Sequence, residues 1–242
     1  MILKNLIKDI SIISSKGDLN VEISGLSQNV NKAKKGDLFF CYKGVNFDGH
    51  NFCHEILKKE VSALVVEKFL NVDLPQILVR KTRKVMPKLC NIFFNDVLKD
   101  LKFVGVTGTN GKTTTTSLIF DLLKSNDYAV GLIGTNGVKF GKNEVQSNLT
   151  TPDTIDLFYL FNQMKTTGIK IVVMEVSAHA LALDKLLGIK FEVGVFTNLT
   201  QDHLDFFKTM EKYSLTKLKF LNKKYCKNCF VKKEPSRNFL KK

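Results

Sequence analysis

The sequence of 242 residues has few cysteines and no long hydrophobic run. Its five cysteines are few and odd in number, which argues against a disulfide framework and indicates reduced thiols. No apolar stretch approaches the roughly 20 residues of a membrane-spanning helix. Residues 1–13 alternate apolar and charged side chains, so they lack the uninterrupted apolar stretch of a secretory signal. These absences predict a cytoplasmic protein without a membrane partner.

Arginine is also scarce, although the chain carries a net charge of +14. The positive residues are nearly all lysine, and the only arginines are Arg80, Arg83 and Arg237. Nucleic-acid readers usually employ the bidentate hydrogen bonding of arginine. Residues 222–242 hold eight basic residues and one acid, Glu234, which is half of the excess charge. We therefore expect a lysine-biased composition with a solvated tail, and no nucleic-acid partner.

One stretch has the pattern of a phosphate-binding loop. Residues 105–114 read Gly-Val-Thr-Gly-Thr-Asn-Gly-Lys-Thr-Thr, follow an apolar run and open into a helical pattern that reaches about residue 124. Such a loop lets backbone N–H groups face an anion at a helix N-terminus, where the helix dipole adds favourable potential. Lys112 would reach the terminal phosphates and Thr113 would bind Mg²⁺. The general pattern has glycine where this chain has Val106, so Gly108 supplies the turn. The alternative is a glycine-rich turn that binds nothing.

The loop, continued by Thr115 and Thr116, resembles the ATP loop of the Mur ligases, the ATP-dependent amide-forming enzymes of peptidoglycan precursor synthesis. Folylpolyglutamate and cyanophycin synthetases share the fold but vary these residues, so the loop indicates only the superfamily. Further motifs favour the MurE type, and the resemblance covers residues 23–221. The resemblance implies these ATP-binding residues: Gly108, Thr109, Asn110, Gly111, Lys112, Thr113 and Thr114.

The first 97 residues predict a small mixed α/β domain. Strands are expected at 38–42, 63–66 and 76–79, with a helix near 52–60. The segments 23–26, 35–40, 43–44 and 48–50 are similar to the uridine-nucleotide domain of the MurE and MurF ligases. The family's Asp-Ser-Arg triplet, which helps to hold uracil and diphosphate, is replaced here by Asn-Val-Asn at 29–31. The alternative is a β-domain that has lost tight UDP binding. The resemblance places the nucleotide among Leu26, Val30, Val45, Asn46 and Phe47.

Residues 98–242 predict an α/β domain with a parallel sheet. Strands at 103–107, 129–134, 170–176 and 192–197 are expected to alternate with helices at 112–125 and 153–167, with helices on both faces of the sheet. Ligands of such sheets bind at the carboxyl ends of the strands. The Mur ligases continue with the rest of this sheet and a C-terminal domain. We therefore expect the chain to be an N-terminal fragment with an incomplete central domain.

Two groups of polar residues follow expected strands or loops of this domain. Residues 148–153 read Asn-Leu-Thr-Thr-Pro-Asp, in which Thr151 could cap a helix that starts at the proline. The resemblance instead gives Thr150 and Thr151 a contact with the muramoyl-peptide substrate. Residues 174–179 read Met-Glu-Val-Ser-Ala-His, and Glu175 at the end of an apolar strand needs a cation such as Mg²⁺. The resemblance implies that Glu175 binds Mg²⁺ and that Ser177 contacts the substrate. It also implies that Lys185 binds the acidic peptide of the substrate.

Two later motifs complete the expected site. Residues 196–205 resemble the family's Thr-Asn-Leu-x-x-Asp-His-Leu-Asp, in which His203 would be a second-metal ligand. A helix-capping role for Asp202 explains that residue equally well. Lys217 aligns with the family lysine that reacts with CO₂ to form a carbamate ligand of Mg²⁺. The expected catalytic residues are Lys112, Glu175, His203 and Lys217, and the expected metal ligands are Thr113, Glu175, His203 and carbamylated Lys217.

The resemblance implies a function for the parent protein. It would use ATP and Mg²⁺ to join a third amino acid, diaminopimelate or lysine, to UDP-N-acetylmuramoyl-L-alanyl-D-glutamate through an acyl phosphate. Its partners would be that UDP-muramoyl-dipeptide and the amino acid, with the protein as a monomer and this chain alone inactive. The alternatives are a nucleotide-binding remnant without catalysis and another ligase of the superfamily, such as MurF or cyanophycin synthetase.

Overall fold

A computed structural model describes residues 1–44, 47–147 and 149–231 of the chain. Val45 and Asn46, which were expected near the nucleotide, lie outside these residues, as does Asn148. The chain forms two compact units. The first comprises Met1–Val97 and Asp153–Asn162, and the second comprises Leu98–Pro152 and the chain from Gln163 onward. Within the described ranges, no helix combines the length and the hydrophobicity needed to span a bilayer.

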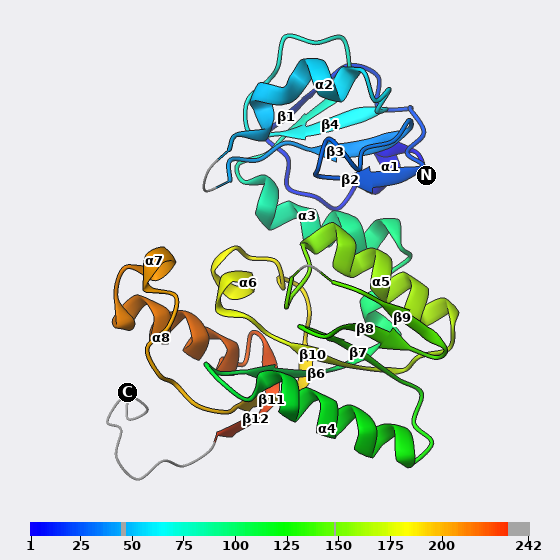
Figure 1. The fold of residues 1–242 in the computed structure, drawn as a ribbon. Helices are drawn as coiled ribbons and strands as arrows, with labels where there is room; N and C mark the ends of the chain where they lie inside the picture. Colours follow the sequence, from blue (N-terminus) through cyan, green and yellow to red (C-terminus); the bar gives the residue numbers. More distant parts are fainter. Residues whose placement is uncertain (45–46, 148, 232–242) are drawn as a thin grey trace. The chain divides into compact units, whose positions relative to one another are not determined.

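The first unit is built on a five-stranded sheet of order β1-β5-β4-β3-β2 (Figure 1). β2 to β5 run parallel and β1 pairs antiparallel with β5. The three predicted strands are confirmed as β3, β4 and β5, and the helix predicted near 52–60 is a 3-10 turn followed by α2. The strands are β1 Ser14–Lys16, β2 Gly25–Ser27, β3 Asp37–Phe40, β4 Ala63–Val66 and β5 Gln76–Leu78, and the helices are α1 Leu3–Leu6, η1 Gly49–Phe52, α2 Cys53–Leu57 and α3 Thr82–Phe93.

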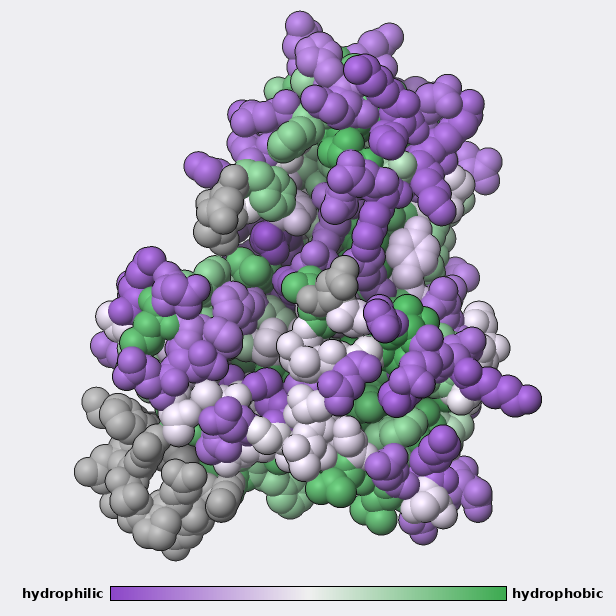
Figure 2. Space-filling model, viewed as in Figure 1, coloured by the Kyte–Doolittle hydropathy of each residue, from purple (hydrophilic) through white to green (hydrophobic). Residues whose placement is uncertain are grey.

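Apolar alternation explains the core of this unit. Phe39 on β3 and Leu64 and Val66 on β4 point to one face of the sheet, where Ile56 of α2 covers them. On the surface, Figure 2 shows hydrophilic residues over much of the visible face of this unit. The abundant lysines of the sequence are thus largely solvated.

The second unit has a seven-stranded sheet of order β12-β11-β6-β10-β7-β8-β9. β12, β11, β6, β10 and β7 are parallel, which confirms the predicted α/β class. The sheet is nevertheless mixed, because β8 and β9 extend it as antiparallel hairpins. The strands are β6 Lys102–Thr107, β7 Val130–Gly134, β8 Gly137–Phe140, β9 Asn143–Val145, β10 Ile171–Glu175, β11 Phe191–Phe196 and β12 Cys226–Val231.

β12 corrects the expectation of a solvated tail that begins at residue 222. This strand pairs in parallel with β11, from Cys226 opposite Phe191 to Val231 opposite Phe196. It is the edge strand of the sheet, and all of its residues except Cys226 are exposed. A lysine-rich segment can therefore join the sheet through its backbone without burying its charges.

Helices cover both faces of this sheet, with α4 on one side and α6 and α8 on the other (Figure 1). α4 packs Phe120 against Val130, Leu132 and Val173 of the sheet. Leu118 and Leu122 of this helix are 65% and 64% exposed, so its outer side carries apolar side chains. The helices from residue 97 onward are η2 Val97–Lys99, α4 Lys112–Ser125, α5 Thr154–Thr166, α6 Ala178–Ala182, α7 Leu204–Phe207, α8 Met210–Leu218 and η3 Lys219–Leu221, of which η2 and α5 are divided between the two units.

Candidate functional site

The predicted phosphate loop joins β6 to α4, and its two glycines are required for different reasons. Gly108 has φ +148°, and a Cβ there would lie 1.9 Å from the Thr197 hydroxyl. Gly111 has φ +79° but open space around its Cβ position, so only its backbone conformation calls for glycine. Gly111 is also the N-cap of α4 and offers no capping side chain. The N–H groups of the first helical turn are therefore available to an anion.

The segment after β11 holds the loop in place. The side-chain amide of Asn198 binds both backbone groups of Asn110. Its Oδ1 accepts from the Asn110 N–H at 2.9 Å, and its Nδ2 donates to the Asn110 carbonyl at 3.1 Å. The Thr197 hydroxyl donates to the same carbonyl at 2.6 Å. The Asn198 carbonyl accepts from the Thr109 N–H at 3.0 Å. The loop is thus fixed by groups at the carboxyl end of the neighbouring parallel strand.

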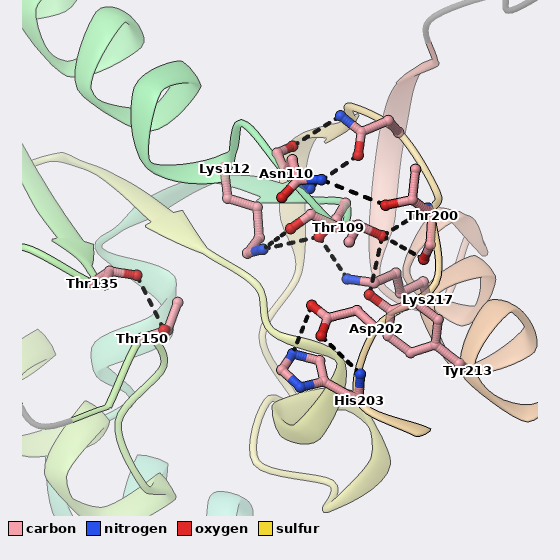
Figure 3. Close-up of polar contacts among 12 residues, drawn as sticks. Thr109, Asn110, Lys112, Thr135, Thr150, Thr200, Asp202, His203, Tyr213 and Lys217 are labelled. Atoms are coloured by element: carbon pink, nitrogen blue, oxygen red, sulfur yellow. Dashed lines mark hydrogen bonds and ion pairs between the residues drawn. The ribbon is translucent and has the colours of Figure 1, made fainter. Parts of the chain in front are cut away.

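Two lysine amines converge on one carbonyl of this loop (Figure 3). Lys112 Nζ donates to the carbonyls of Gly108 at 3.0 Å and Thr109 at 2.8 Å. Lys217 Nζ, from α8, donates to the same Gly108 carbonyl at 2.7 Å. The structure therefore brings together two of the predicted catalytic residues that are far apart in the sequence.

Burial lowers the pKa of both amines, and the charge of Lys112 lowers that of Lys217 further. Burial lowers the pKa of Lys112, while the charges of Glu175 and Asp202 act in the opposite direction. Burial and then the charge of Lys112 lower the pKa of Lys217 to about 7, against the smaller opposing effect of Asp202. A substantial fraction of Lys217 is therefore an uncharged amine at neutral pH.

Glu175 ends β10 as a buried carboxylate, with 1% of its surface exposed. Its Oε1 accepts from the Thr135 N–H at 2.8 Å and its Oε2 from the Thr135 hydroxyl at 3.2 Å. Among the residues that the structure describes, no lysine, arginine or histidine forms an ion pair with it. Two neutral donors leave acceptor positions on a carboxylate free, and these suit a hard cation.

His203 lies at the start of α7 in a left-handed conformation, with φ +53°. Its Nε2 is 3.4 Å from Asp202 Oδ2, and its ring packs 4.8 Å from that of His179. Asp202 Oδ1 accepts from the His203 N–H at 2.8 Å, and no side chain caps α7, so the helix-capping interpretation of Asp202 is wrong. Within residues 1–44, 47–147 and 149–231, no three histidine, cysteine, aspartate or glutamate side chains cluster as a metal site. The metal role of His203 stays a prediction.

The alternative role of Thr151 as a helix cap is wrong as well, while its substrate contact stays a prediction. α5 begins at Thr154, and the Thr151 hydroxyl instead donates to the Glu175 carbonyl at 2.9 Å and accepts from the Ser177 N–H at 3.0 Å. Tertiary bonds to the end of β10 replace the local capping bond. The Thr150 hydroxyl lies 3.1 Å from that of Thr135, so the loop that holds it meets the end of β7 (Figure 3).

Four other residues predicted to contact substrate are Ser177, Lys185, Leu26 and Val30, and each has a structural role or a buried position. The Ser177 hydroxyl caps α6 by accepting from the Ala180 N–H at 3.2 Å. Lys185 is buried in the second unit. In the first unit, Leu26 is buried on β2 and Val30 packs against the apolar core. Their contacts with substrate stay predictions.

A pocket of about 430 Å³ opens beside the phosphate loop. It continues from Gly111 and the first turn of α4 toward β11 and β12. Its lining residues are Gly111, Thr115, Val195, Phe196, Thr197, Asn198, Phe230 and Val231.

Sequence reasoning missed several residues that shape this site. Thr135 binds Glu175, Asn198 brackets Asn110, and the hydroxyl of Tyr213 lies 3.1 Å from that of Thr109. Thr135 and Asn198 carried a usable signal, because they follow β7 and β11 at the edge of the parallel sheet where Thr107 and Glu175 end β6 and β10.

The sequence is similar to a known protein family and to enzymes of known activity. The family model for the Mur ligase middle domain matches residues 106–240. The chain is 42% identical over 224 residues to the UDP-N-acetylmuramoyl-L-alanyl-D-glutamate–2,6-diaminopimelate ligase of Clostridioides difficile, which covers 92% of this chain and 46% of that protein. It is 43% identical over 221 residues to ligase 1 of the same name from Clostridium acetobutylicum, covering 90% of this chain and 46% of that protein.

Solved structures agree with these matches. A UDP-N-acetylmuramoyl-L-alanyl-D-glutamate–2,6-diaminopimelate ligase superposes with a TM-score of 0.81 and 25% identity, over 96% of this chain and 47% of that one. A MurF ligase from Thermotoga maritima in complex with ADP matches with a TM-score of 0.56 and 26% identity, over 90% of this chain and 52% of that one. The chain spans about half the length of the curated relatives that it matches.

Proposed function

Because the chain belongs to the Mur ligase family, we propose that it carries the nucleotide and ATP sites of a MurE-type ligase acting in the cytoplasm. The complete protein would add diaminopimelate or lysine to UDP-N-acetylmuramoyl-L-alanyl-D-glutamate. We assign uridine-nucleotide binding to residues 1–97 and ATP binding to residues 98–242. The observation that carries the proposal is the convergence of Lys112 and Lys217 on the Gly108 carbonyl beside Glu175 and Asp202.

The loop fits a nucleoside triphosphate. The first turn of α4 offers N–H groups without a side-chain cap, and Lys112 adds a charge beside them. The 430 Å³ pocket adjoins the same turn at Gly111 and Thr115, which leaves room for the nucleoside. ATP therefore suits the loop and the pocket together.

The oxygen ligands for Mg²⁺ would be the Glu175 carboxylate and the Thr113 hydroxyl, with His203 as a ligand of a second ion. When bound, Mg²⁺ neutralises charge on the phosphates during transfer. The uncharged fraction of Lys217 can attack CO₂, forming an N–C bond and releasing one proton to solvent. The resulting carbamate would supply oxygen ligands where the amine now lies.

The proposed reaction has two steps. The side-chain carboxylate of D-glutamate attacks the γ-phosphorus of ATP, and ADP leaves. The amine of the incoming amino acid then attacks the acyl phosphate, and phosphate leaves with formation of the amide. Lys112 would offset the charge of the transferring phosphoryl group, while Thr150, Thr151, Ser177 and Lys185 would orient the muramoyl-peptide.

The test combines ATP binding with trapping of the acyl phosphate. We expect the 242-residue chain to bind ATP in the presence of Mg²⁺, measured by calorimetry. With UDP-muramoyl-dipeptide and hydroxylamine, formation of a hydroxamate would report the acyl phosphate, and the complete parent protein should form the tripeptide. Absence of ATP binding would contradict the assignment. Binding without hydroxamate from either protein would instead favour a nucleotide-binding remnant.

Glu175→Gln tests the metal assignment separately. The amide keeps the size of the side chain but loses the charge that a hard cation needs. We expect ATP affinity measured with Mg²⁺ to fall about tenfold or more, while affinity measured with EDTA stays unchanged. Glu192→Gln, at an exposed ion pair with Lys227, is the matched control. Equal losses with and without Mg²⁺ would contradict a metal role for Glu175.

A further inference from the structure

Tyr213 is a residue of α8 that the proposed mechanism does not use. Its side chain is completely buried, and its hydroxyl lies 3.1 Å from the hydroxyl of Thr109 in the phosphate loop (Figure 3). The Thr109 hydroxyl also contacts both backbone groups of Thr200, donating to the carbonyl at 3.1 Å and accepting from the N–H at 3.0 Å. Thr109 has one hydroxyl proton, and Thr200 takes it, so Tyr213 must be the donor to Thr109.

The ring of Tyr213 makes a second link to the same loop. Lys217 lies one helical turn further along α8, and its Nζ is 5.1 Å from the centre of the Tyr213 ring. That amine donates to the carbonyl of Gly108, the residue before Thr109. Tyr213 is therefore linked to two consecutive loop residues. Its hydroxyl contacts Thr109, and its ring lies next to the Lys217 amine that binds Gly108.

Packing alone does not account for a tyrosine here. The centre of the Tyr213 ring lies 5.3 Å from the ring centre of Phe207 and 6.1 Å from that of His203. A phenylalanine would make both ring contacts equally well. The hydroxyl is the added group, and its hydrogen bond goes to a loop residue with an ATP role.

We propose that Tyr213 is a positioning residue for the phosphate loop. Its hydroxyl fixes the Thr109 side chain, which ties the loop to Thr200, and its ring packs beside the Lys217 amine that binds Gly108. The proposal rests on the ATP-binding role assigned above to this loop. Because hydroxyl and ring have separate tasks, Tyr213→Phe removes the first and leaves the second.

Amide hydrogen exchange of the nucleotide-free chain tests the contact itself. In Tyr213→Phe we expect exchange to quicken about fivefold in peptides that cover residues 108–112 and 198–202, with the rest of the second unit unchanged. Tyr225→Phe is the control, since Tyr225 is a tyrosine of the same unit with only 7% exposure. Quickened exchange spread evenly over the whole unit would show a merely structural role and overturn the proposal.

ATP affinity tests the consequence. Loss of one buried hydrogen bond predicts about fivefold to tenfold weaker binding for Tyr213→Phe, and at least as large a loss for Thr109→Val, which also removes the bonds to Thr200. The double variant should bind no more weakly than Thr109→Val alone, and Thr109→Ser, which keeps the hydroxyl, should bind with an affinity close to that of the unchanged chain. Additive losses, or no loss in Tyr213→Phe, would overturn the proposal. Local quickening of exchange in a chain that does not bind ATP would uphold the contact and refute the ATP assignment instead.

Discussion

Replacing Lys217 by methionine should remove a pH dependence of stability that the buried amine imposes. In the folded chain the pKa of Lys217 is about 7, whereas an unperturbed lysine has a value of 10.5. Between these values the unfolded chain binds the additional proton. The free energy of unfolding therefore rises with pH from about 7 to 10.5, and the penalty of the buried amine is largest below that window.

The magnitude follows from the same two values. Each pKa unit corresponds to about 1.4 kcal/mol, so Lys217 should add roughly 2 kcal/mol to the free energy of unfolding between pH 7 and pH 9. Methionine has a similar length and no charge. The Gly108 carbonyl keeps a donor in the variant, because Lys112 also binds it at 3.0 Å. The stability difference between Lys217→Met and the unchanged chain should therefore shift by that amount across the two pH values.

Urea unfolding followed by circular dichroism at pH 7, 8 and 9 measures this difference. Buffers free of CO₂ keep Lys217 as an amine. Lys212→Met, on the exposed side of the same helix, should show no such shift. A difference between Lys217→Met and the unchanged chain that is the same at pH 7 and pH 9 would refute the argument, because it would mean that the amine titrates as it does in water.

Three further predictions concern the phosphate loop. Lys112→Ala should abolish measurable ATP binding in calorimetry, whereas Lys124→Ala, at the exposed end of α4, should not change it. Gly108→Ala should lower the free energy of unfolding by about 2 kcal/mol or more through its clash, and Gly111→Ala by about 1 kcal/mol through φ alone, so equal losses in urea unfolding would contradict the geometry. Asn198→Ala removes both side-chain bonds to the neighbouring loop and should weaken ATP binding about tenfold, with unchanged affinity as the contrary result.

Much of the second unit could be predicted because its signals are local. The helix predicted at 112–125 is α4, Lys112–Ser125, since the Gly-Lys-Thr pattern marks its first residue. Apolar runs of five or six residues located β6, β7, β10 and β11 to within one residue or two. β12 was not predicted, because an edge strand needs no apolar pattern. Its pairing depends on β11 rather than on its own side chains.

The site was predictable as a set of residues but not as a set of contacts. Motifs named Lys112 and Lys217, yet their common acceptor depends on α8 packing against a loop that lies about a hundred residues earlier. The same limit explains why the capping prediction for Thr151 was wrong. The local sequence fits a helix cap, but the Thr151 hydroxyl binds the backbone of Glu175 and Ser177 instead. Local patterns describe what a side chain can do, and tertiary packing selects among those possibilities.

The charges around Gly108 connect these contacts with the proposed chemistry. Lys112 helps to lower the pKa of Lys217, so its own charge favours the uncharged neighbour that CO₂ requires. Carbamylation would convert that neighbour into an anion, which would in turn stabilise the charged form of Lys112, whose pKa burial lowers. The two lysines would then carry opposite charges at one loop, a cation for the phosphates and an anion for Mg²⁺. A single shared carbonyl thus places Lys112 where its charge would promote the proposed modification of Lys217 and where the resulting carbamate would stabilise the charge of Lys112.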